Sequence, residues 1–130
     1  MKVLALDYGS ARTGVAVSDP TGTLARPVGV VERAATESGL AELARLAREE
    51  EVERVVVGLP LTMRGARGEQ AAETERFVEA LRGVLSVPVE LYDERFTTDL
   101  AQRTPGAAPK DALAAAHLLS TYLEWCAARS

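Results

Sequence analysis

Three carboxylates stand where a predicted strand ends or a predicted helix begins, and their positions suit one kind of chemistry. Asp7 follows an apolar strand, Glu94 follows another, and Asp111 lies in the first turn of the last predicted helix. An ionised side chain beside a buried strand is costly to desolvate unless a cation neutralises it. Oxygen ligands from separate elements suit Mg²⁺ or Mn²⁺ better than Zn²⁺. The pattern therefore predicts metal-assisted phosphoryl chemistry.

Each carboxylate also has an ordinary structural interpretation. Asp7 could end its strand and cap the turn that follows. Glu94 could belong to a solvated loop, and because neighbouring strand residues face opposite ways, only one of Asp93 and Glu94 can face Asp7. Asp111 would be stabilised by the dipole of its own helix with or without a metal. The residues taken singly leave both interpretations open.

Basic side chains close to the carboxylates are candidate contacts for a substrate phosphate. Arg12 lies in the turn after Asp7, between Gly9 and Gly14. We expect the two glycines to let a phosphate approach the backbone closely, where Arg12 could bind it.

The loop 58–68 is the best candidate for contact with nucleic acid, because it carries Arg64 and Arg67 ahead of a predicted helix N-terminus. Arg95 and Lys110, each next to one of the carboxylates, could also hold phosphate. The alternatives are an ordinary strand-to-helix loop and a genome composition that favours arginine over lysine. The prediction is a local patch of phosphate contacts.

Apolar runs, turn signals and helical spacing of apolar residues predict the elements that position these side chains. Strands are expected at 2–8, 14–18, 24–31, 52–57 and 87–92, and helices at 36–51, 69–85 and 110–128. Short turns join the first three strands into an antiparallel meander, and Pro27 marks the third as an edge strand. The order βββαβαβα predicts an α/β fold in which a mixed five-stranded sheet carries helices on both faces.

Length and composition indicate an ordinary globular protein. A chain of 130 residues predicts one domain, and a net charge of −4 argues against a broadly basic surface for nucleic acid. The single cysteine, Cys126, excludes an intramolecular disulfide and a cysteine-based zinc site. Without a signal-like N-terminus or an apolar run of membrane length, we expect a cytoplasmic protein with no membrane partner.

Four ordered segments, which together span nearly the whole chain, resemble the YqgF family. They are residues 6–19 with Asp7-Tyr8-Gly9, 56–65 with Gly58-Leu59-Pro60, 92–98 with Asp93-Glu94-Arg95, and 110–123 with Lys110-Asp111. Members of this family are described as RuvC-like Holliday-junction resolvases and as nucleases that mature the 5′ end of small-subunit ribosomal RNA. The resemblance implies an RNase H-like fold and a single nuclease domain over residues 1–130. The chain departs from the family pattern at Arg64, where Asp or Asn is usual, and at Ala66, where Ser or Thr is usual.

Carried over to this sequence, the resemblance makes Asp7, Glu94 and Asp111 the catalytic and metal-binding residues, with Mg²⁺ or Mn²⁺ as the cofactor. It implies a metal-dependent nuclease that processes the 5′ end of the small-subunit ribosomal RNA precursor during ribosome biogenesis. Structured RNA and ribosomal particles would be its partners, and the expected state is a monomer or a homodimer.

Three other functions fit parts of the same pattern. A Holliday-junction-resolving DNA endonuclease would use the same metals but should dimerise, so as to present two sites to two strands. A non-catalytic ribosome-assembly factor would keep the fold and lose the dependence on metal. An actin-like ATPase shares Asp-x-Gly after its first strand, but it needs a second comparable domain that 130 residues do not provide.

Overall fold

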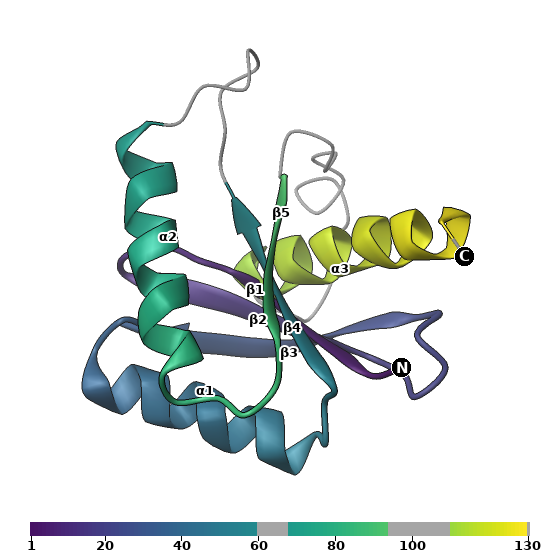
Figure 1. Ribbon diagram of the computed structural model, residues 1–130, viewed down its shortest axis with the longest axis horizontal. Helices are drawn as coiled ribbons and strands as arrows, with labels where there is room; N and C mark the ends of the chain where they lie inside the picture. The colour runs from purple at the N-terminus through teal and green to yellow at the C-terminus, as the bar shows by residue number, and fades with distance from the viewer. Residues whose placement is uncertain (60–67, 94–109, 130) are drawn as a thin grey trace.

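A computed structural model describes residues 1–59, 68–93 and 110–129, and the predicted order of elements is confirmed (Figure 1). The strands are β1 (Val3–Asp7), β2 (Arg12–Ser18), β3 (Ala25–Glu32), β4 (Arg54–Leu59) and β5 (Val89–Asp93), and the helices are α1 (Glu37–Glu49), α2 (Glu69–Arg82) and α3 (Lys110–Ala128). The observed bounds differ from the predicted ones by two or three residues at most, because the ends of elements depend on local capping.

The five strands form one mixed sheet in the order β3-β2-β1-β4-β5. The meander pairs β1 with β2 and β2 with β3 in antiparallel fashion, and β1 pairs with β4, and β4 with β5, in parallel fashion. Pro27 lies on the edge strand β3, as predicted, where a missing N–H is tolerated. The register between β2 and β3 shifts beside it, between Val15 and Ala16.

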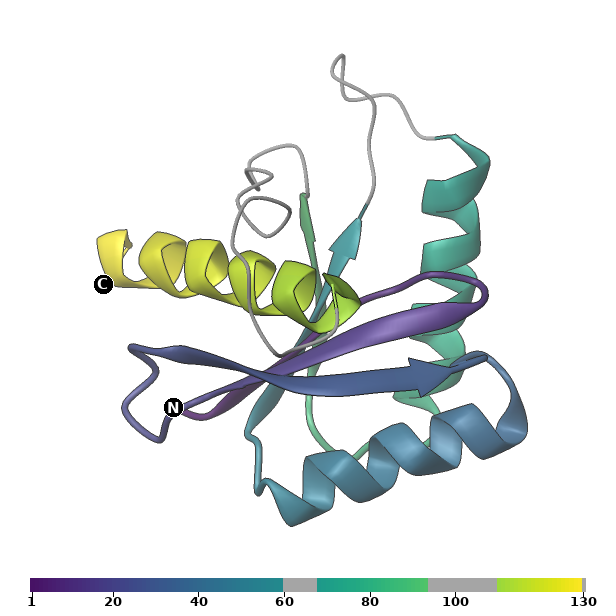
Figure 2. The same cartoon turned by 180° about the vertical axis from the view of Figure 1, so that it is seen from behind.

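Alternation along the strands divides the apolar side chains between two cores. In β1, Leu4 and Leu6 join the core beneath α1 and α2, whereas Val3 and Ala5 join the core beneath α3. Figures 1 and 2 show α1 and α2 on one face of the sheet and α3 alone on the other. The nearly all-apolar composition of β1 follows from this burial on both faces.

Local signals account for the two helices on the first face. Thr36 caps α1, where its side-chain oxygen accepts a hydrogen bond from the Gly39 N–H at 3.2 Å. In α2, Phe77, Val78 and Leu81 recur at helical spacing and are buried against the sheet. In the described residues, no helix is long and apolar enough to cross a membrane.

The start of α3 lies directly against the backbone of β2 at Gly14. A Cβ atom at position 14 would lie 1.8 Å from the carbonyl oxygen of Asp111, so only glycine fits beneath the first turn of this helix. Gly29, on the neighbouring strand β3, has no atom within 4 Å of a Cβ built in the same way. The contact at Gly14 therefore sets how closely α3 approaches the sheet.

Gly14→Ala should displace the first turn of α3 and lower the free energy of unfolding by about 1–3 kcal/mol, the usual cost of overpacking. Urea denaturation measures the change. Gly29→Ala is the matched control in the same sheet, and it should leave stability unchanged or raise it slightly, since alanine restricts the unfolded chain. Equal effects of the two substitutions would contradict the role assigned to the Gly14 contact.

Candidate metal and substrate site

Asp7 is the last residue of β1, and its position in the strand places it on the α3 face of the sheet. Val3 and Ala5, two and four residues earlier, belong to the core beneath α3, and side chains two residues apart point the same way. Asp7 is half-buried and pairs with Gly14 of β2. The strand end therefore holds a carboxylate just below the start of α3.

Glycines flank Asp7 on both neighbouring strands. In β2, Gly14 pairs with Asp7. In β4, Val57 pairs with Leu6 in parallel fashion, so the next residue, Gly58, lies beside Asp7. Because neither glycine has a side chain, the sheet presents only backbone on either side of Asp7.

Asp111 comes to the same corner of the molecule through the backbone contact with Gly14. That contact joins the first turn of α3 to the residue that pairs with Asp7. Arg12 Nε forms an ion pair with Asp111 Oδ2 at 3.3 Å, and the exposed fractions of the two side chains are 65% and 36%. The structure thus brings together three of the predicted site residues: Asp7, Asp111 and Arg12.

The remaining predicted site residues cannot be placed in the same way. Glu94, Arg64, Arg67 and Arg95 lie outside the described residues, and so does the side chain of Lys110, although Lys110 begins α3. Within the described part of the chain, no three His, Cys, Asp or Glu side chains form a group that could hold a metal ion.

The expectation that Gly9 and Gly14 let a phosphate approach the backbone is wrong on the side where a side chain would point, because that space is occupied at both positions. At Gly14 that space holds the Asp111 carbonyl oxygen, and at Gly9 it holds the Arg12 carbonyl oxygen, 2.5 Å from where a Cβ would lie. Both glycines therefore accommodate the protein backbone. The sequence could not distinguish this from a ligand contact, because both need the same missing side chain.

A small cleft beside Asp7 includes a residue that the sequence analysis missed. The cleft has a volume of about 180 Å³ and lies between the turn after β1 and the first two turns of α2. Tyr8 donates a hydrogen bond from its hydroxyl to Glu73 Oε1 at 3.2 Å, and its ring stacks on Phe77 with centroids 4.3 Å apart. Burial, and then the charge of Glu73, raise the pKa of Tyr8, so its hydroxyl stays a donor.

A sequence signal for Glu73 was present. Glu73 is half-buried and lies four residues before Phe77, at the border of the buried face of α2. A carboxylate at that border needs a partner, and Tyr8 is that partner. The pair links α2 to the residue that follows Asp7.

The residues in place suit a hard divalent cation. The described part of the corner offers carboxylate oxygens from β1 and α3, which is the donor type that Mg²⁺ and Mn²⁺ prefer. The pairing of Arg12 with Asp111 shows that this corner attracts positive charge. Two carboxylates alone make an incomplete ligand set, so a third oxygen donor is required.

Comparison with known proteins identifies close relatives. The profile of a family described as "RuvX: Holliday junction resolvase" matches residues 1–125. A protein of Chloroflexus aggregans named "Putative pre-16S rRNA nuclease" is 45% identical over 131 residues, which cover 94% of this chain and 92% of the relative. A protein of the same name from Syntrophomonas wolfei is 37% identical over 133 residues, which cover 95% of this chain and 94% of the relative.

One solved structure is similar over almost its whole length. Thermus thermophilus RuvC in complex with a Holliday junction substrate aligns with a TM-score of 0.61 and 17% identity, covering 97% of this chain and 96% of that chain. Similarity at this level of identity concerns the fold, and it confirms the predicted RNase H-like architecture.

The ion pair between Arg12 and Asp111 should contribute little to stability, because both side chains are well exposed. In a double-mutant cycle with Arg12→Gln and Asp111→Asn, urea unfolding should give a coupling free energy below about 1 kcal/mol. A coupling of several kcal/mol would mean that the pair is a structural clamp, and Arg12 would then not be available to a substrate.

Proposed function

The chain belongs to the RuvX family, also called YqgF, and from this membership we propose that it is a divalent-metal-dependent nuclease acting on the 5′ end of the small-subunit ribosomal RNA precursor. Two relatives at 45% and 37% identity carry the name of a pre-16S rRNA nuclease. Nuclease activity agrees with the family and with the RuvC-like fold.

The observation that carries the proposal is that Asp7 and Asp111, from opposite ends of the chain, both have their backbone next to Gly14. Asp7 at the end of β1 pairs with Gly14, and the backbone of Asp111 lies against that same glycine. Both residues fall within motifs that the family shares. A fold that needed these side chains only as caps would not require the start of α3 to lie over the partner of Asp7.

We assign Asp7 and Asp111 as ligands of Mg²⁺ or Mn²⁺, with Glu94 as the third. Glu90 and Tyr92 of β5 lie on the α3 face, because both contact Tyr122 of α3. Position 94 has the same parity as these two, whereas Asp93 has the opposite parity. When bound, the metal would activate water and stabilise the leaving oxygen of the phosphodiester.

The other residues of the corner would bind and orient the substrate. Arg12 is exposed, so its guanidinium can exchange the Asp111 carboxylate for a phosphate of the nucleic acid. Tyr8 and Glu73 hold the turn after β1 against α2 and so keep the backbone of Asp7 in place. Arg64, Arg67, Arg95 and Lys110 are proposed as further phosphate contacts.

A Holliday-junction resolvase is the second candidate, and the description of the matching family favours it. The two activities would use the same carboxylates and differ in substrate and assembly. Cleavage assays on precursor ribosomal RNA and on four-way DNA junctions, combined with measurement of the oligomeric state, separate them. A resolvase should act as a dimer on the junction, since two strands must be cut.

Asp7→Asn should abolish metal-dependent cleavage while leaving the metal-free protein as stable as the wild type, because the substitution removes one of several neighbouring like charges. Mg²⁺ or Mn²⁺ at about 100 times its dissociation constant should stabilise the wild type by about 2.7 kcal/mol, since only the folded site binds the ion. The metal should do little for the variant. Thermal melts of both proteins with and without metal measure this.

A purely structural Asp7 gives a different result. If it only caps the turn after β1, the variant should lose about 1 kcal/mol of stability, and metal should stabilise neither protein. That combination would exclude the proposed metal site whatever the cleavage assay shows.

Glu94→Gln should abolish cleavage and remove the metal-dependent rise in melting temperature. Asp93→Asn is the matched control in the adjacent position, and it should retain most of the activity because of its opposite parity in the strand. Cleavage rates and melts of the two variants test the assignment, and the reverse result would give the role of ligand to Asp93.

A further inference from the structure

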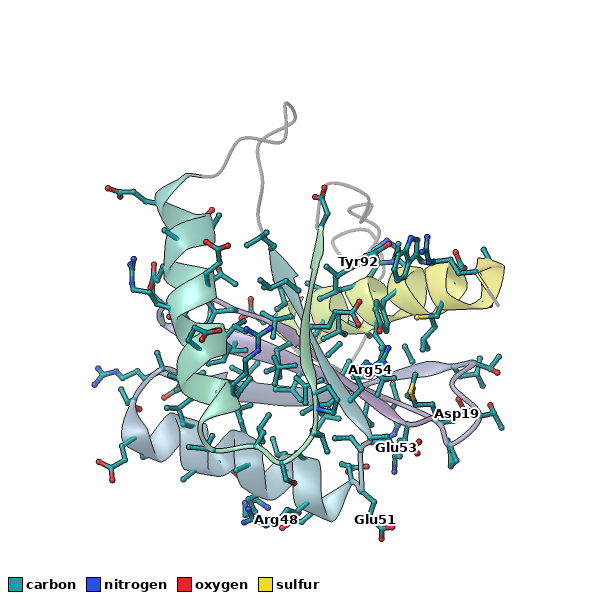
Figure 3. All side chains as sticks on the ribbon, in the orientation of Figure 1. Asp19, Arg48, Glu51, Glu53, Arg54 and Tyr92 are labelled. Atoms are coloured by element: carbon teal, nitrogen blue, oxygen red, sulfur yellow. The ribbon has the colours of Figure 1, made fainter. Side chains whose placement is uncertain are left out.

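A groove between β5 and α3 combines an exposed aromatic ring with carboxylates. Its volume is about 620 Å³, and the residues that line it include Tyr92, Asp93, Glu124 and Trp125. Trp125 lies about four turns of α3 beyond Asp111, roughly 20 Å along the helix axis. The groove is therefore separate from the metal corner, the proposed metal site at Asp7 and Asp111. Figure 3 labels Tyr92, which lies beside α3.

Buried aromatic side chains hold the Trp125 ring in position from below. Tyr92 and Tyr122 lie with their centroids 5.8 and 6.1 Å from that of Trp125, and Tyr122 is fully buried. The Tyr122 hydroxyl donates to Glu90 Oε1 and accepts from Arg54 Nη1, each at 2.9 Å. Trp125 itself is 40% exposed, which leaves part of a rigidly held ring open to solvent.

The chain itself shows what this ring can bind. The guanidinium carbon of Arg129 lies 4.6 Å from the centroid of the Trp125 ring, a cation–π contact. Arg129 follows the end of α3 and is exposed, so it can leave the ring without disturbing the core. A guanidinium from another molecule could take its place.

The charges around the groove also favour a cation. Among the described residues that line it, Asp93 and Glu124 carry carboxylates and none is basic, whereas Glu90 is already paired with Arg54 at 3.4 Å. Burial raises the pKa of Tyr92, and the neighbouring Cys126, Asp93 and Glu124 raise it further. The carboxylate of Glu124, next to Trp125 in the chain, therefore favours a cation over a phosphate group at the ring.

We propose that this groove is a docking site for an arginine-rich segment of a partner protein, with one guanidinium stacked on Trp125 and another beside Glu124. Arg129 then acts as an internal competitor for the ring. Arginine suits the site better than lysine, because its planar guanidinium stacks on an aromatic face and pairs with a carboxylate at the same time. This interaction does not depend on the proposed nuclease activity.

Trp125 is the single tryptophan of the chain, so its fluorescence reports directly on the groove. The full-length protein is titrated with a peptide of alternating arginine and serine, with the lysine counterpart, and with a single-stranded RNA. The arginine peptide should change the emission of Trp125 and bind about two- to fivefold more tightly than the lysine peptide. RNA should leave the emission unchanged. Equal binding of the two peptides, or an equal response to RNA, would overturn the proposal.

Matched variants separate local recognition from general attraction to an acidic protein. Glu124→Gln should weaken binding of the arginine peptide about two- to fivefold. Glu37→Gln removes another exposed carboxylate, from α1 on the opposite face, and should have no effect. Arg129→Ala should strengthen binding, about twofold, by removing the internal competitor. Equal effects of the two glutamate substitutions, or weaker binding by Arg129→Ala, would refute the docking site.

Discussion

The close contact between the backbone of α3 and Gly14 of β2 is the constraint on which the site depends. A side chain at position 14 would overlap the carbonyl oxygen of Asp111, so the helix can begin here only above a glycine. The same glycine is the strand partner of Asp7. One missing side chain therefore brings together two carboxylates that are far apart in the sequence. It also fixes the direction in which α3 leaves the corner and crosses the sheet.

The two faces of the sheet have different roles. The face beneath α1 and α2 is a conventional apolar core, built from alternate residues of the central strands. The face beneath α3 holds the second core, and the corner with Asp7 and Asp111, proposed to bind metal, lies apart from the acidic groove along the same helix. Because α3 is long and packed along its length, both sites are held on one rigid element. Tyr122, buried between them, ties the helix to β4 and β5 through Arg54 and Glu90.

The distribution of charge reconciles an acidic chain with a nucleic-acid substrate. The net charge of −4 would repel a phosphate backbone if it were spread evenly. At the metal corner, bound cations would neutralise the carboxylates, and Arg12 supplies an exposed positive charge at the same place. The groove near Trp125 keeps its negative potential and so suits a basic protein segment. Distinct local charges thus distinguish two surfaces along the same helix.

The sequence alone determined the elements, their order and the mixed sheet, because the apolar run of β1 and the helical spacing in α2 are local patterns that burial enforces directly. It also identified Asp7 and Asp111 as candidates, since a carboxylate at a strand end or helix start is visible without coordinates. Only the tertiary structure decided that the missing side chain of Gly14 makes room for the backbone of α3, and that Glu73 is the partner of Tyr8, 65 residues away. These contacts join elements distant in the chain, so they depend on how the helices pack on the sheet, which no local pattern specifies.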